Sequence, residues 1–194
     1  MPDRSAALLQ AIGSRVVIAD GAMGTQLQEE APTLEDYLGL EGCNEILNVS
    51  RPDMIRRIHD AYLDTGVDAI ETNTFGANWS NLSDYDIDER IEELAEAGAR
   101  IAREAVDHAE ANDGRLRWVL GSMGPGTKLP SLGHTTYAHL KETFALQAQG
   151  LIRGGSDALL IETSQDLLQT KAAVNGCKLA AQRTGVRLPI LVEV

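Results

Sequence analysis

Residues 66–72 read Gly-Val-Asp-Ala-Ile-Glu-Thr, and residues 155–163 return to the same pattern as Gly-Ser-Asp-Ala-Leu-Leu-Ile-Glu-Thr. Each stretch begins with a glycine suited to ending a helix and continues into a short apolar run that closes on Glu-Thr. A strand–helix unit that recurs along a chain is typical of repeated α/β architectures. The repeat therefore favours a barrel over a sheet without internal repetition.

Five short apolar runs extend this pattern along the chain: Arg15–Ala19, Val67–Glu71, Trp118–Gly121, Ala158–Glu162 and Pro189–Val194. Runs without polar alternation indicate parallel strands that are buried on both faces. Apolar residues at helical spacing lie between them, in Arg51–Thr65, Asp86–Glu110, Thr135–Arg153 and Asp166–Arg183. The alternation of strands and helices predicts a parallel sheet in an α/β fold.

The length of the chain bears on how much of a barrel it contains. A parallel (β/α)8 TIM-type barrel takes roughly 250 residues, whereas this chain has 194 and shows five strands and four helices. We therefore expect residues 1–194 to be the N-terminal portion of a single barrel domain, about its first half, with the C-terminal half absent. The alternative fold is a standalone five-stranded flavodoxin-like sheet.

The composition excludes several classes of protein. The chain has 17 basic and 29 acidic residues, for a net charge of -12, and no clustered basic face of the kind that binds nucleic acid. No apolar run approaches the roughly 20 residues that span a bilayer, and Met1–Gln10 lacks the apolar block of a signal peptide. We expect a cytoplasmic protein without nucleic-acid or membrane partners. Its two cysteines, Cys43 and Cys177, are expected to be reduced structural thiols.

The turns after the strands are the expected location of the site, because reactive groups in parallel α/β folds gather at the carboxyl ends of strands. Asp20 follows the first strand and precedes Gly21 and Ala22. Its carboxylate can meet a ligand cation, while the amides of Gly21 and Ala22 are free to bind a carboxylate. The alternative role for Asp20 is to cap the following helix.

Glu71 and Glu162 occupy equivalent positions in the two copies of the repeat. Paired carboxyl groups can perform acid–base chemistry or bind an ammonium group. Either residue can instead be structural, as an acceptor for neighbouring loop amides. We expect one of the two to be functional and the other structural.

The glycine-rich segment Gly121–Lys128 differs from a phosphate-binding P-loop, which places Lys directly after the second glycine and opens a helix. Here Thr127 separates Gly126 from Lys128, and Pro130 follows where the helix would run. We interpret the segment as a rigid loop beside the active site.

The histidines give little support to a metal site. His59, His108 and His139 fall on helices among charged residues and are expected at the solvated surface, whereas His134 lies in a loop on the active side and can touch a substrate. The sequence contains neither an H-E-x-x-H nor a C-x-x-C motif. We therefore expect no metal ligands in this chain.

Together, the strand-end turns resemble a known family. Asp-Gly-Ala-Met-Gly-Thr at 20–25, Glu-Thr-Asn-Thr-Phe at 71–75 and Glu-Thr-x-x-Asp at 162–166 occur in order, and Gly-Cys-Asn-Glu-Ile-Leu-Asn at 42–48 leads into Arg-Pro-Asp at 51–53. The pattern resembles the homocysteine S-methyltransferase family, and within it the homocysteine-binding module of cobalamin-dependent methionine synthases. The resemblance covers nearly the whole chain, from about Val16 to Val194.

This resemblance implies a (β/α)8 barrel and methyl transfer to a homocysteine thiolate activated by zinc. In methionine synthases the methyl group comes from methylcobalamin on another module, and a separate barrel supplies methyltetrahydrofolate. The implied cofactors are therefore zinc and cobalamin. The implied partners are homocysteine, the remaining half of the barrel, and the cobalamin and folate modules.

Carried over by motif, the family's substrate contacts fall on six residues of this chain. Asp20 and Glu162 hold the ammonium group of homocysteine, and the amides at Gly21 and Ala22 take its carboxylate. The pocket floor is shaped by Asn73 and Gly124.

The family's zinc ligands are cysteines on later strands, in an Asn-Cys and a Gly-Gly-Cys-Cys segment. Neither Cys43 nor Cys177 matches these positions, and the ligands are expected beyond Val194. We therefore expect no catalytic residue in this chain, which is inactive by itself.

Two alternative functions remain. Relatives that use betaine or S-methylmethionine as methyl donor have similar first halves, so the donor is not fixed by the resemblance. A half barrel also leaves unpaired strand edges, which suits a non-catalytic binding or assembly module that forms a homodimer.

Overall fold

A computed structural model describes residues 3–193, and its centre is a parallel four-stranded sheet with the order β1-β2-β3-β4. The strands are β1 (Ala69–Glu71), β2 (Trp118–Met123), β3 (Ala158–Ile161) and β4 (Ile190–Val192). Strands that follow one another in sequence are neighbours in space, as repeated β-α-β units require. The expected parallel α/β fold is confirmed, although Val194 of the last expected strand lies outside the described residues.

The segment expected as the first strand joins this sheet at a single position. Ala19 forms an isolated parallel bridge with Ala69, and the rest of Arg15–Ala19 has no ladder. Beside this bridge, the Ile18 carbonyl accepts the amides of Asp68 and Ala69. The Asp68 carboxylate accepts the Ile18 amide at 3.0 Å and both terminal nitrogens of the Arg15 guanidinium. The segment nevertheless lies beside β1, in the predicted place.

Four long helices correspond to the expected ones: α4 (Pro52–Asp64), α6 (Ile91–Asp113), α7 (Tyr137–Gly154) and α8 (Leu167–Thr184). The expected start of α6 at Asp86 was too early. Asp86 has a left-handed backbone with φ 56°, and short 3-10 turns precede the helix. Further helices were missed: α1 (Arg4–Ser14), α2 (Met23–Glu30), α3 (Leu47–Ser50) and α5 (Trp79–Leu82).

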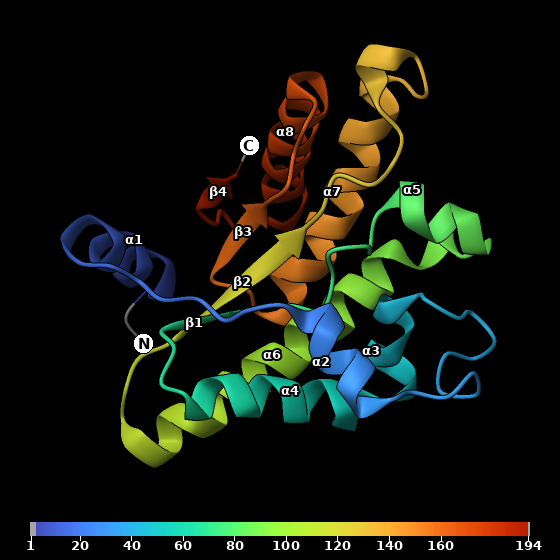
Figure 1. Cartoon of the computed structure of the whole chain (residues 1–194). Helices are drawn as coiled ribbons and strands as arrows, with labels where there is room; N and C mark the ends of the chain where they lie inside the picture. Colours follow the sequence, from blue (N-terminus) through green and yellow to red (C-terminus); the bar gives the residue numbers. More distant parts are fainter. Residues whose placement is uncertain (1–2, 194) are drawn as a thin grey trace.

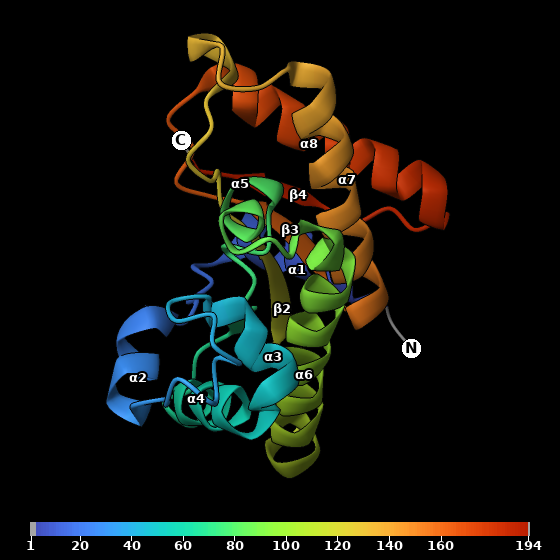
Figure 2. The ribbon, with the colours of Figure 1, turned by 90° about the vertical axis from the view of Figure 1, so that its right-hand side faces the viewer.

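The sheet has a helix-covered face and an inward face. On the first, α4 packs on β1, α6 and α7 on β2, and α8 on β3 and β4 (Figure 1 and Figure 2). The inward face presents Ala69, Leu120 and Leu160, which pack with Leu8 of α1 in one apolar cluster. Helix α1 thus closes the amino ends of β2 and β3, where Ser5 donates a hydrogen bond to the Asp157 carbonyl. None of the helices among residues 3–193 has the length and apolar character needed to cross a bilayer.

Glycines allow the helices of the covered face to pack closely. A Cβ at Gly150 of α7 would lie 2.4 Å from the carbonyl oxygen of Glu92 on α6, and one at Gly176 of α8 would lie 2.8 Å from that of Lys141 on α7. Backbone atoms cannot yield as flexible side chains do. The spacing of α6, α7 and α8 therefore depends on the absence of a side chain at these positions.

His59 is an exception to the expected surface histidines. His108 and His139 are exposed, but His59 on α4 is 0% exposed, and neither ring nitrogen has a hydrogen-bond partner among the described residues. The expectation failed because α4 turns this face toward the core. Burial, aided by the charge of Arg56, lowers the pKa of His59 from 6.5 to about 3.

This burial makes the free energy of unfolding sensitive to acid. Below its ordinary pKa, His59 takes up a proton in the unfolded chain but stays neutral in the folded one, so stability is lost as the pH falls below 6.5. Between about pH 7.5 and about pH 5, the free energy of unfolding of the native protein is expected to fall by about 2 kcal/mol more than that of His59→Leu. Urea unfolding at both pH values measures this difference. His108→Gln is the exposed control, and a His59→Leu protein with unchanged acid sensitivity would contradict the assignment.

Candidate functional site

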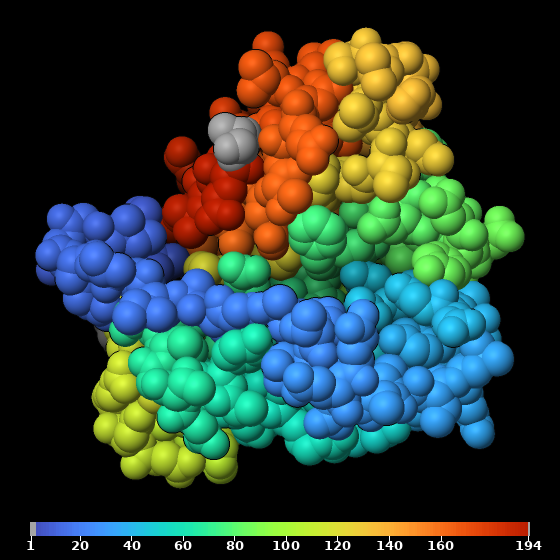
Figure 3. Space-filling view, in the orientation of Figure 1, coloured from blue at the N-terminus to red at the C-terminus, as the bar shows by residue number. Residues whose placement is uncertain are grey.

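A cavity of about 430 Å³ lies at the carboxyl ends of the strands. Its wall is formed by Asp20, Gly21, Ala22, Met23, Gly24, Asn44, Glu45, Glu71, Thr72, Asn73, Phe75, Ser122 and Glu162. The segment between α1 and α2, which contains Asp20, crosses the face of the molecule. It is the blue band beneath the orange and red C-terminal elements in Figure 3. The cavity is where a parallel α/β fold is expected to place its chemistry.

The acidic residues of this wall follow from the alternation of side chains along each strand. Ala69, Leu120, Leu160 and Leu191 belong to the inward cluster, so the residue two positions further on also faces inward. Those next residues are Glu71, Ser122, Glu162 and Glu193. An apolar inward layer is thus topped by a polar layer that carries three carboxyl groups. We refer to Glu71, Ser122, Glu162 and Glu193 as the polar layer.

Asp20 joins this layer and does not cap a helix. The cap residue of α2 is Ala22, without a side-chain hydrogen bond, whereas Asp20 Oδ1 accepts the amide of Glu71 at 2.9 Å. Burial raises the pKa of the Asp20 carboxyl to about 7, and the charge of Glu162 adds to this effect. Of the two roles open to Asp20, the structure excludes the helix cap.

Glu162 and Glu71 differ in their contacts. Glu162 accepts a hydrogen bond of 2.6 Å from Ser122 Oγ, and its pKa is raised, mainly by burial. The carboxyl group of Glu71 has no hydrogen-bond partner among the described residues. Burial, with the charges of Glu162, Asp20 and Glu193, raises its pKa to about 8. Thr163 follows Glu162 with φ 57°, which is uncommon for a β-branched residue and turns the chain at the end of β3.

The amides of Gly21 and Ala22 are available to a ligand, since neither donates a hydrogen bond within the described residues. They lie directly beside Asp20 in the cavity wall. Tyr62 steadies this turn from α4, because its hydroxyl group donates to the Ala22 carbonyl at 3.1 Å. A carboxyl group and two open amides are therefore close enough to bind opposite charges of one small molecule.

Asn73 and Gly124 occupy different layers around the cavity. Asn73 lines it, and its side-chain nitrogen donates to the Asn44 carbonyl and to Asn48 Oδ1, both at 2.9 Å. Gly124 lies behind the wall, where its amide donates to the Phe75 carbonyl at 3.0 Å. A Cβ there would lie 2.7 Å from that oxygen. The predicted role of Gly124 is thus limited to supporting Phe75.

Several lining residues were not among the predicted contacts, and Glu45, Met23 and Phe75 are three of them. Glu45 is buried, and its Oε1 accepts the Gly76 amide at 2.8 Å. It ties the segment after residue 42 to the turn after β1, and nothing local in the sequence signals this contact. Met23 and the half-exposed Phe75 give the cavity an apolar portion.

The loop after β2 and His134 lie outside this wall. Gly126, with φ 68°, packs against Asn78 and Ser80, and the Thr127 amide donates to Ser80 Oγ at 2.7 Å. These contacts hold the loop, as expected of a rigid segment. His134 is exposed and accepts the Leu129 amide through Nδ1 at 3.2 Å.

The described residues contain no group of three His, Cys, Asp or Glu side chains arranged to hold a metal ion. Cys43 and Cys177 are buried and separate. Burial raises the pKa of Cys43 to about 11 and that of Cys177 to about 12, which disfavours the thiolate that zinc requires. Residues 3–193 therefore do not fit a zinc site.

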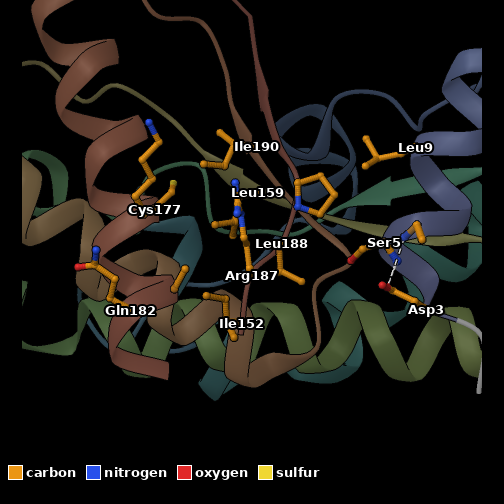
Figure 4. Close-up of a pocket in the computed structure, with 14 residues that line it drawn as sticks. Asp3, Ser5, Leu9, Ile152, Leu159, Cys177, Gln182, Arg187, Leu188 and Ile190 are labelled. Atoms are coloured by element: carbon orange, nitrogen blue, oxygen red, sulfur yellow. Dashed lines mark hydrogen bonds between the residues drawn. The ribbon is translucent and has the colours of Figure 1, made fainter. Parts of the chain in front are cut away.

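A larger cavity, of about 790 Å³, lies at the other end of the sheet. Figure 4 shows it between α1, α8 and the segment before β4, with Cys177, Leu188 and Ile190 in its wall. It borders the amino end of β4. The smaller cavity lies at the carboxyl ends of the strands, where parallel α/β folds place their functional sites, and is therefore the better candidate.

The geometry of the smaller cavity suits a zwitterionic amino acid. Its acidic side can bind an ammonium group, its open amides a carboxylate, and Met23 and Phe75 an apolar side chain. None of the residues that line it is Lys, Arg or His. A ligand cation therefore meets no competing positive charge from the wall.

Comparison with known proteins agrees with this geometry. The family profile described as "Homocysteine S-methyltransferase" matches residues 17–194. Methionine synthases of Mycobacterium tuberculosis and Mycobacterium leprae are 54% and 52% identical over 187 residues, which is 96% of this chain. The chain spans 16% and 15% of the length of these two relatives.

Solved structures show the same fold. The homocysteine methyltransferase MmuM from Escherichia coli, in its metallated form, is 21% identical with a TM-score of 0.74, over 96% of this chain and 65% of that protein. Its oxidised form gives the same TM-score at 20% identity, over 94% of this chain and 63% of the other. The fold of this chain therefore matches part of the fold of these proteins.

Proposed function

The chain belongs to the homocysteine S-methyltransferase family, and on that premise we propose that it forms the homocysteine-binding part of a methionine synthase. The observation that carries the proposal is the cavity at the strand ends, where half-buried carboxyl groups and two open amides line a space suited to an amino acid. The family specifies which amino acid this is. The identity of 54% and 52% to methionine synthases favours that branch.

In this proposal each part of the wall recognises one part of homocysteine. Asp20 and Glu162 bind the ammonium group, because both are inward carboxyl groups beside the cavity. The amides of Gly21 and Ala22 bind the carboxylate. Met23 and Phe75 contact the methylene groups, so that the sulfur points away from the acidic residues. These contacts orient the substrate for methyl transfer, which forms a sulfur–carbon bond while the donor keeps the electrons of the broken bond.

Zinc and cobalamin enter the proposal only through the family. Zinc activates the homocysteine thiol in the implied chemistry, but the described residues do not form its site. The role of this chain in the proposal is to bind and orient the amino acid. The cobalamin and folate modules of a methionine synthase are the partners that follow from the proposal.

Methyl transfer from different donors tests this function. The protein at its natural length is incubated with homocysteine and, separately, with methylcobalamin, betaine or S-methylmethionine, and methionine is measured. We expect methylcobalamin to support methionine formation and the other two donors to give only background. Methionine made from betaine or S-methylmethionine would place the protein in another branch. Absence of both methionine formation and homocysteine binding would overturn the function.

A further inference from the structure

Glu71 occupies a position that homocysteine binding by Asp20 and Glu162 alone does not explain. It ends β1, and its amide donates to Asp20 Oδ1 at 2.9 Å. Two positions before it, Ala69 belongs to the inward apolar cluster, so the Glu71 side chain also faces inward. It lines the cavity together with Asp20 and Glu162.

The surroundings of Glu71 are acidic on each side that borders the cavity. Asp20 approaches from the segment before α2, Glu162 from the end of β3 and Glu193 from the end of β4, while Glu45 lines the cavity from the segment before α3. No Lys, Arg or His lines the cavity. The Glu71 carboxyl group also lacks a hydrogen-bond partner among the described residues, unlike Glu162, which has Ser122.

We propose that Glu71 is a third carboxyl contact for the substrate ammonium group, and that this group displaces a proton from Glu71 when the amino acid binds. The inference rests on the proposed function. Burial, together with the like charges of Glu162, Asp20 and Glu193, favours the neutral form of Glu71 in the empty cavity, and an arriving cation favours its charged form. Binding then releases the proton to solvent. The raised pKa of Glu71, about 8, agrees with this exchange.

The exchange sets the direction of the pH dependence. Below a pKa of about 8, Glu71 holds a proton that the ligand must displace, so the affinity rises with pH toward that value and then levels off. Each displaced proton contributes about a tenfold change in affinity per pH unit. A glutamine at this position resembles the protonated carboxyl group and has no proton to release. The two proteins should therefore bind alike at low pH and differ at high pH.

Titration calorimetry with L-methionine tests this, because methionine carries the same ammonium and carboxylate groups but no thiol proton. The protein at its natural length is titrated at about pH 6, about pH 7 and about pH 8, in two buffers of different ionisation enthalpy, to count released protons. We expect about one proton fewer from Glu71→Gln than from the native protein at intermediate pH. We also expect about tenfold or greater weakening at about pH 8 and little at about pH 6.

Three further proteins and ligands make the result specific. Glu104→Gln removes an exposed carboxyl group on α6 and should change neither the affinity for methionine nor the number of protons released. Glu71→Asp keeps a titratable group and should restore part of the proton release. The analogue 4-(methylthio)butanoate lacks the ammonium group, and the native protein and Glu71→Gln should bind it equally.

The outcomes separate this inference from the proposed function. Methionine binding with the same affinity and proton release in Glu71→Gln and native protein would overturn the role of Glu71 and leave the function intact. If the native protein binds neither methionine nor homocysteine, both the function and the inference fail. A thermal unfolding curve confirms that each variant is folded before titration.

Discussion

Replacing Asp20 with asparagine is expected to lower kcat/KM for homocysteine by about a hundredfold to a thousandfold. The substitution preserves the size of the side chain and an oxygen that can accept the Glu71 amide, but it removes the charge facing the substrate ammonium. Loss of one partner from a buried, hydrogen-bonded charge pair costs about 2 to 5 kcal/mol, and a tenfold change in rate corresponds to about 1.4 kcal/mol. The effect should appear mainly in KM, because Asp20 binds substrate in both ground and transition states.

Steady-state methionine formation by the protein at its natural length measures the Asp20→Asn effect. Asp64→Asn is a suitable control, since Asp64 is exposed at the end of α4 and lies outside the cavity wall. A kcat/KM for Asp20→Asn within about threefold of the native value, a difference under about 1 kcal/mol, would show that Asp20 does not bind the substrate.

Gly150→Ala is expected to lower the free energy of unfolding by about 3 kcal/mol or more. The new methyl group would lie 2.4 Å from the Glu92 carbonyl and 2.9 Å from the Glu96 amide nitrogen, both in the backbone of α6. Helices α6 and α7 must separate to admit it, and overpacking of a close-packed interior typically costs about 1 to 3 kcal/mol. Contact with backbone on both sides places this substitution at the upper end of that range or beyond it.

Gly13→Ala provides the matched comparison for this effect. Gly13 lies in α1, and apart from the neighbouring backbone of its own helix no described atom lies within 4 Å of the position that a methyl group would take. Alanine in a helix is favoured over glycine by about 0.5 to 1 kcal/mol, so Gly13→Ala should raise the stability slightly. Urea unfolding of both variants measures the difference. A Gly150→Ala protein as stable as the native one would mean that α6 and α7 are not packed as described.

Much of the fold follows from short-range features of the sequence. The repeat around Ala69 and Ala158 predicts two buried parallel strands, because an apolar run without alternation suits burial on both faces. The glycines expected to end helices at Gly66 and Gly155 have a left-handed backbone, at φ 89° and 97°. The strand order follows from the connection rule for β-α-β units.

The parts that escaped prediction depend on contacts far apart in the sequence. The ladder at residues 15–18 is replaced by bonds to Asp68, about fifty positions away. The burial of His59 depends on how α4 packs. The charged residues next to His59 in the sequence predicted an exposed position instead. The Asp3 cap signals α1, but this helix packs against residues of the inward face of the sheet that lie far along the chain.

In the candidate site, too, the residues at strand ends were predicted and those brought in by long-range contacts were not. Asp20 and Glu162 were each predicted at the end of a strand, and the family resemblance implied that they act together. The structure places both in one cavity wall. Glu45 was not predicted, since it reaches the wall from a segment between helices. Gly124 was assigned to the pocket floor, yet the structure places it behind Phe75. Motif position identifies the strand-end residues better than those that reach the site through folded loops.

The orientation of a bound amino acid tests the central claim most directly. In a crystal structure of the protein at its natural length with L-methionine, we expect the ammonium nitrogen within hydrogen-bonding distance of Asp20 and Glu162. The ligand carboxylate should lie at the amides of Gly21 and Ala22. Methionine bound elsewhere, or turned so that its ammonium group faces away from both carboxyl groups, would contradict the account.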